Sequence, residues 1–113
     1  MRECFRREER LKRRKEIREV FDKGKRIGCQ GAKLFVLKNK LPCNRICFTF
    51  SRGFGNAVKR NRAKRLGREA YRKLKSRLCC GYDLILLLYS EDSQTLTGRI
   101  GQLEYLVSRA GLL

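Results

Sequence analysis

Histidine is absent from this sequence, acidic residues are scarce, and no long apolar run occurs. The 113 residues include 29 lysines and arginines against 11 aspartates and glutamates, which gives a formal net charge of +18 at pH 7. Histidine is the most frequent general acid or base in catalysis, and the few carboxylates are mostly scattered singly. We therefore do not expect an enzyme that acts unaided through histidine or through a two-carboxylate metal site.

The lack of long apolar runs also bears on location. No stretch approaches the roughly 18 apolar residues of a membrane-spanning helix. Residues 1–7 are basic and lead into further charge, whereas a secretory signal continues into an apolar region. These absences predict a cytoplasmic protein without a membrane partner.

Six cysteines are present, among them Cys43 and Cys47 and the adjacent Cys79 and Cys80. A disulfide framework requires an oxidising compartment, which the missing signal argues against. No Cys-x-x-Cys knuckle occurs with histidine or with a second knuckle, so a zinc site is not expected either. The sequence therefore predicts reduced cysteines that pack in the core as small apolar residues.

The length and the apolar content of 42% predict one compact domain, residues 10–113, preceded by a basic N-terminal arm, residues 1–9. Apolar residues at helical spacing predict three helices, at residues 10–23, 56–78 and 97–110. Apolar or alternating runs predict strands at residues 33–37, 45–51 and 82–89, and leave open a further short strand around residues 25–30. The pattern indicates an α+β fold with helices packed on one sheet.

Two local features refine this arrangement. Gly24 is expected to end the first helix in the left-handed conformation. In the strand 45–51, Ile46, Phe48 and Phe50 alternate with smaller and more polar side chains. This alternation predicts one buried sheet face and one face that is free to meet a ligand.

Positive charge is concentrated between Arg52 and Arg77, where eleven lysines and arginines accompany a single acid, Glu69. Most of these cations lie opposite the apolar side of the central helix, so one side packs and the other is basic. Arg60 instead falls within the apolar arc, where we expect it to hold a phosphate or a hydrogen bond in the first turn. Guanidinium, asparagine and serine side chains near a helix N-terminus predict RNA as the partner.

The order of these residues is more specific than their charge. The run Ser51-Arg52-Gly53-Phe54-Gly55-Asn56-Ala57-Val58-Lys59-Arg60-Asn61-Arg62-Ala63-Lys64-Arg65 closely resembles the signature of the protein component of bacterial ribonuclease P. The resemblance extends to Arg10-Leu11-Lys12, Phe35-Val36-Leu37 and Tyr82-Asp83-Leu84-Ile85, and covers about residues 10–110. It implies an α-β-β-β-α-β-α order with a left-handed βαβ crossover, although such crossovers are nearly always right-handed.

The resemblance also implies a division of labour within a ribonucleoprotein endonuclease. The RNA subunit would remove the 5′ leader of precursor tRNA with Mg²⁺ held mainly by that RNA and the substrate, and neither an organic cofactor nor DNA would be needed. The residues implied to bind the RNA subunit are Arg60, Asn61, Arg62, Lys64, Arg65 and Arg68. The residues implied to bind the leader, in a cleft between the first helix and the sheet, are Ile17, Phe21, Phe35, Ser51, Arg52 and Asn56.

Two positions depart from the family's pattern. Gly53 stands where a second basic residue is usual, and Ile17 stands where an aromatic residue is common. The leader would then depend less on stacking at position 17 and more on Phe21. Without an open cleft, however, Phe21 and Phe35 would be ordinary core residues.

Other classes of protein share this composition. A ribosomal or other structural RNA-binding protein would be equally small and basic, and so would a DNA-binding regulator. A helix-turn-helix regulator needs a second short helix beside its recognition helix, whereas strand-like runs flank the basic helix here. The RNA that co-purifies from cells would distinguish a ribosomal protein from a ribonuclease P subunit.

Overall fold

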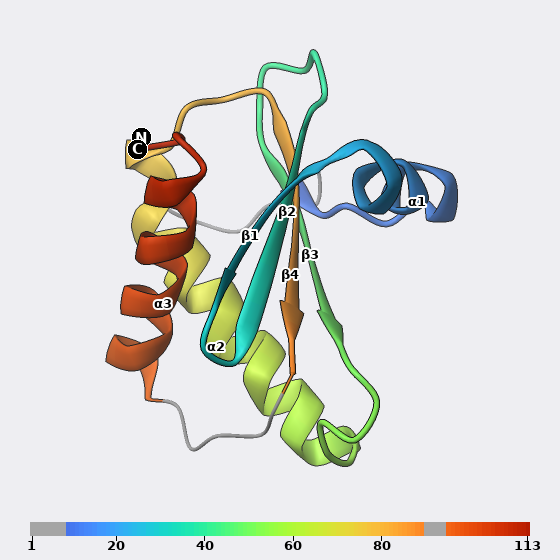
Figure 1. The fold of residues 1–113 in the computed structure, drawn as a ribbon. Coiled ribbons are helices and arrows are strands. Elements are labelled where there is room, and N and C mark those ends of the chain that lie inside the picture. Colours follow the sequence, from blue (N-terminus) through green and yellow to red (C-terminus); the bar gives the residue numbers. More distant parts are fainter. Residues whose placement is uncertain (1–8, 90–94) are drawn as a thin grey trace.

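The computed structural model describes residues 9–89 and 95–113, which form helices packed on both faces of one sheet (Figure 1). The helices are α1 (Arg14–Lys23), α2 (Ala57–Leu74) and α3 (Leu96–Arg109), and a 3₁₀ helix, η2 (Lys75–Arg77), follows α2. The strands are β1 (Lys25–Cys29), β2 (Ala32–Lys38), β3 (Arg45–Phe50) and β4 (Tyr82–Leu88). The predicted order is confirmed, and the strand left open around residues 25–30 is β1.

The four strands lie in the order β1-β2-β4-β3. The pairs β1–β2 and β2–β4 are antiparallel, whereas β3 and β4 are parallel and are joined through α2. This is the βαβ crossover expected in the second half of the chain, and its left-handed sense stays a prediction. No described helix is long and apolar enough to cross a membrane.

The helices divide between the two faces of the sheet. Figure 1 shows α2 and α3 on one face and α1 on the other. Leu34, Leu84 and Leu86 are buried in the larger cluster under α2 and α3, whereas Phe35 and Ile85 pack under α1. Because successive residues of a strand face opposite sides, β2 and β4 bury both faces and form continuous apolar runs.

Two glycines permit close packing. A Cβ atom on Gly67 of α2 would lie 2.5 Å from Cε1 of Phe48, so the helix backbone rests directly on that ring. Gly24 was predicted to be left-handed, and this was wrong: its φ of −72° and ψ of 154° are extended. Glycine is needed there because a Cβ atom would lie 2.3 Å from the carbonyl oxygen of Val20.

The first helix begins later than predicted. The backbone N–H of Leu11 donates to the carbonyl oxygen of Ile46 at 3.0 Å, and Arg10 forms a parallel bridge with the same residue, so this segment pairs with β3. Glu9 was assigned to the N-terminal arm, but it is buried, and its carboxylate accepts from Lys75 Nζ at 2.8 Å. The rest of the arm, residues 1–8, lies outside the described residues.

The five described cysteines are free thiols, and none of them is fully buried. Cys29, Cys43 and Cys47 are partly buried, and Cys79 and Cys80 are exposed in the connection between η2 and β4. The prediction of core packing is therefore confirmed only in part: Cys29 and Cys47 pack against the two clusters, whereas Cys79 and Cys80 do not. The buried residues of both clusters are mainly leucine, isoleucine, valine and aromatic side chains.

Candidate nucleic-acid interface

The basic helix α2 starts at a capped N-terminus. Asn56 precedes the helix, and its Oδ1 accepts a hydrogen bond from the backbone N–H of Lys59 at 3.0 Å. The first turn of α2 contains no acidic residue. Its remaining N–H groups and the positive end of the helix dipole therefore add to the charge of the side chains that follow.

The six residues implied to bind the RNA subunit lie in the N-terminal two thirds of α2, and we call them the basic stripe. Five of them are exposed, and Lys64 is half-buried. Arg60 is exposed, so its expected binding of a phosphate stays a prediction. Val58, in the first turn of α2, is 76% exposed, so this end of the helix extends beyond the apolar cluster. The stripe consists of Arg60, Asn61, Arg62, Lys64, Arg65 and Arg68.

A hollow of about 630 Å³ runs along the stripe and is bordered by one acid. That acid is Glu69, whose carboxylate accepts from the guanidinium of Arg72 at 2.7 Å. The negative charge of Glu69 is therefore directed towards Arg72. The hollow is lined by Asn61, Lys64, Arg65, Arg68, Glu69 and Arg72.

A smaller hollow of about 180 Å³ lies where the stripe meets the outer edge of β3. Four cations from two segments line it: Arg10 and Lys12 before α1, and Lys64 and Arg68 of α2. Burial raises the pKa of the Cys47 thiol in β3, and the nearby charge of Lys64 lowers it. Lys64 on α2 and Cys47, which packs with the α1 cluster, therefore line the same hollow at this edge of the sheet.

Three of the residues implied to bind the leader pack together between α1 and the sheet. The rings of Phe21 and Phe35 meet edge-on with centroids 4.7 Å apart, and Ile17 packs into the same cluster. Phe21 is partly exposed, but Phe35 is only 6% exposed. The structure therefore brings these three residues together and leaves Phe21 as the aromatic ring that a base can reach.

The other residues implied to bind the leader lie further along the sheet. Ser51 Oγ donates to the carbonyl oxygen of Tyr89 at 2.8 Å, and Arg52 and Asn56 are exposed in the connection to α2. Cys47 of β3 lies level with Phe35 across the sheet, because both pair with Ile85. Ser51 follows Cys47 by four residues, roughly 13 Å along the strand. A leader that touches both groups must therefore run along the sheet.

The turn after β3 explains one departure from the family's pattern. Gly53 has a φ of +80°, which side chains other than glycine adopt only with strain. A basic residue at this position would be strained in this turn. Arg52 is consequently the basic residue that this turn can present.

An ion cluster that the sequence analysis missed fastens α1 to the sheet. Arg45 of β3 donates to Asp83 Oδ2 at 2.7 Å and to Glu16 Oε1 of α1 at 3.2 Å. The hydrogen bonds to Asp83 raise the pKa of Arg45, so its charge persists. The only available signal was an acid, Asp83, within the apolar run of β4, because a buried carboxylate requires a partner.

Two cations on the sheet were also missed, Arg26 of β1 and Lys33 of β2. Each lies over an aromatic ring on the side of α1.

The structure also bears on whether the protein could hold a metal ion. Among residues 9–89 and 95–113, no group of three or more acidic or cysteine side chains is placed to hold a metal ion.

Comparisons with known proteins agree on one family. A family model described as Ribonuclease P matches residues 5–110. The ribonuclease P protein component of Natranaerobius thermophilus is 46% identical over 77 residues, which cover 68% of this chain and 67% of that protein. The counterpart from Petrotoga mobilis is 35% identical over 96 residues, covering 85% of this chain and 81% of its own length.

Solved structures show the same fold. The Staphylococcus aureus RNase P protein, in a mutant with defective mRNA degradation activity, superposes with a TM-score of 0.84 at 24% identity, covering 94% of this chain and 91% of that one. The RNase P protein from Thermotoga maritima gives a TM-score of 0.81 at 25% identity, covering 89% of this chain and 96% of that one.

Proposed function

Because this chain belongs to the ribonuclease P protein family, we propose that its basic stripe binds the RNA subunit and that its α1 cleft binds the 5′ leader of precursor tRNA. Membership makes it the protein component of a ribonucleoprotein endonuclease that has an RNA subunit as partner. One observation supports the assignment of two ligands to two separate surfaces. Figure 1 shows α2, which carries the stripe, on one face of the sheet and α1, which carries the partly exposed Phe21, on the other.

The stripe has the chemistry for RNA phosphates. Its guanidinium groups can each donate two parallel hydrogen bonds to a phosphate, and Asn61 adds a single donor or acceptor. Within the described part of the chain, no carboxylate pairs with Arg60, Arg62 or Arg65. The positive charge of these three arginines is therefore available to a bound partner.

Mg²⁺ belongs, in this proposal, mainly to the RNA subunit and the substrate. Mg²⁺ prefers oxygen ligands and commonly takes them from phosphates. The protein surfaces proposed to face RNA carry lysine and arginine, which repel a divalent cation and attract the same phosphates. Precursor tRNA as substrate also places this work in the cytoplasm.

Removing one arginine of the stripe tests the docking of the RNA subunit. We expect Arg62→Ala or Arg65→Ala to weaken association with ribonuclease P RNA. The slope of log affinity against log salt should fall by roughly 0.7 to 0.9 for each phosphate that the variant no longer binds. Titrations of the RNA subunit at several salt concentrations measure this slope.

Arg109→Ala serves as the matched control, because Arg109 is an exposed arginine in the last turn of α3. It should leave the slope unchanged. An unchanged slope for both stripe variants would place their side chains in solvent. Recovery of ribosomal RNA alone from cells would instead favour a ribosomal protein.

A further inference from the structure

Two cations on the α1 side of the sheet are each held over an aromatic ring. The guanidinium carbon of Arg26 in β1 lies 5.8 Å from the ring centroid of Phe35. Lys33 Nζ in β2 lies 5.7 Å from the ring centroid of Tyr89. A cation over a ring face is attracted by the ring quadrupole, so both charges have a defined position on the sheet.

The strand register places these cations next to each other. Arg26 pairs with Phe35, and Gly28 pairs with Lys33, so the two cations occupy adjacent rows of one face. Rows of one face are two residues apart, roughly 6.6 Å along a strand. Gly28 has no atom within 4 Å of the position of a Cβ atom, which leaves the flank of Lys33 open.

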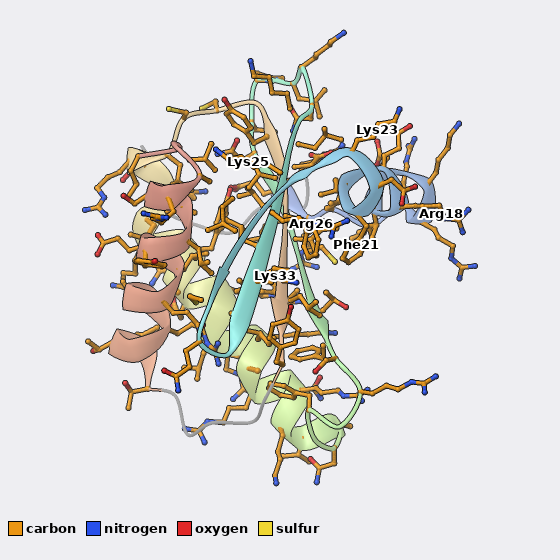
Figure 2. All side chains as sticks on the ribbon, in the orientation of Figure 1. Arg18, Phe21, Lys23, Lys25, Arg26 and Lys33 are labelled. Carbon is orange, nitrogen blue, oxygen red and sulfur yellow. The ribbon has the colours of Figure 1, made fainter. Side chains whose placement is uncertain are left out.

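The charges of Arg26 and Lys33 are not neutralised by the protein. No carboxylate among the described residues pairs with either of them, whereas Arg45 is engaged by two acids. Figure 2 shows Arg26 beside Phe21, in the angle between α1 and the sheet, with Lys23 and Lys25 nearby. Both lysines are exposed, and Lys25 alternates to the other face from Arg26, so positive charge borders both faces of the β1 edge.

We propose that Arg26 and Lys33 bind neighbouring phosphates of the leader where it passes Phe21 and leaves the sheet across the β1 edge. This inference rests on the proposed leader cleft and adds a path and two binding residues to it. Arg26 covers Phe35, so a base stacks on Phe21 while the guanidinium meets the backbone. With Ile17 in place of a stacking residue, backbone contacts carry more of the leader's affinity.

The test uses the protein assembled with ribonuclease P RNA and precursors whose leaders are shortened one nucleotide at a time. We expect R26Q combined with K33Q to lose the affinity that longer leaders add, and to bind mature tRNA as the unchanged protein does. The salt slope for the long-leader precursor should fall by roughly 0.7 for each single-strand phosphate that is no longer bound. R26K, which keeps the charge, should restore most of the slope at position 26.

Lys38→Gln is the matched control, because Lys38 is an exposed lysine of β2 whose position alternates to the other face. It should bind every precursor normally, and all variants should melt as the unchanged protein does. If the variant with both R26Q and K33Q still gains affinity from longer leaders, this inference alone is overturned. An equal loss of affinity for mature tRNA would also overturn it. An unchanged protein that gains no affinity from any leader would overturn the proposed leader cleft, and the inference with it.

Discussion

Phe21 is the residue at which core packing and the proposed binding of the leader overlap. Its edge-on contact with Phe35 belongs to the cluster under α1, yet the ring stays partly exposed. Truncation to alanine would remove both roles at once, because removal of a buried phenylalanine costs about 3–5 kcal/mol of folding free energy. A substitution that keeps the apolar volume is therefore needed.

We expect Phe21→Leu to weaken binding of precursor tRNA by about 1–3 kcal/mol, the contribution of one base stacked on an aromatic ring. Mature tRNA should bind almost as before, and the melting temperature should stay near normal. Binding of the two tRNAs to the assembled enzyme and thermal unfolding of the free protein measure these effects.

Phe50→Leu is a matched control, because Phe50 is a partly buried ring that packs against Phe54 in the cluster under α2 and α3. It should not distinguish the two tRNAs. Equal losses for both tRNAs in Phe21→Leu would show that the ring does not contact the leader. A lowered melting temperature with normal binding would make Phe21 a core residue only.

At the same scale, the sequence could predict residues of the site only where local order carries the information. Arg62 and Arg65 follow from an ordered run on one helix, whose exposed side is set by its own periodicity. Arg26 and Lys33 do not, because their adjacency depends on the register between two strands. The sequence alone left open whether residues 25–30 form a strand at all.

Among the elements, α1 depends most on polar contacts for its position. Its only fully buried residue is Val20. Arg45 joins Glu16 of α1 to Asp83 of β4, and the Asp83 carboxylate also accepts from Asn39 Nδ2 at 2.9 Å. The angle of α1 over the sheet, and with it the position of Phe21, therefore depends on this ion cluster.

Two substitutions separate stability from positioning in this cluster. Arg45→Met leaves the buried Asp83 without its cation, so we expect a loss of about 3–5 kcal/mol in the free energy of unfolding. Glu16→Gln removes only the more exposed pair, which should cost at most about 1 kcal/mol. Because α1 is then less firmly held, leader-dependent binding should still weaken.

Denaturant unfolding and binding of precursor against mature tRNA check both variants. Glu19→Gln is the control for Glu16→Gln, because Glu19 is an exposed glutamate of α1. Normal leader binding by Glu16→Gln would show that α1 keeps its position without Arg45. Arg45→Met with unchanged stability would contradict the importance assigned to this cluster.

The elements themselves could be predicted well where local patterns decide. The three expected strands and three helices exist, as does the strand left open around residues 25–30, and Gly67 marks the close contact of α2 with Phe48. The start of α1 could not be predicted, since Leu11 pairs with a strand 35 residues further along the chain. A long-range hydrogen bond of this kind leaves no periodic signal in its own segment.

For the molecule as a whole, the cations proposed to bind RNA lie on both sides of one sheet, those of the stripe on α2 and Arg26 and Lys33 on the side of α1. We expect the protein alone to cleave no precursor tRNA, and 5′ processing to appear when ribonuclease P RNA and Mg²⁺ are added. The reason is that its proposed role is to bind and align two RNAs. Cleavage assays with each component omitted in turn provide the measurement, and metal-dependent cleavage by RNA-free protein would contradict it.

Whole-molecule properties were predictable in part. The chain order and the RNA partner followed from a specific motif, whereas composition alone left ribosomal and DNA-binding proteins open. The packing of α1 on the face opposite α2 and α3 was not derivable from periodicity, because β2 and β4 are apolar on both faces. Only the assembled sheet determines which helix covers which face.

The two outer strands of the sheet are protected against self-association in different ways. On β3, the segment at Arg10 and Leu11 occupies part of the outer edge through backbone pairing. On β1, the exposed Lys25 and Arg26 guard the edge by charge, which disfavours the addition of a strand from a second copy. If RNA neutralises Arg26 as proposed, Lys25 is left as the charge at the β1 edge, and the bulk of the bound leader then shields that edge from aggregation.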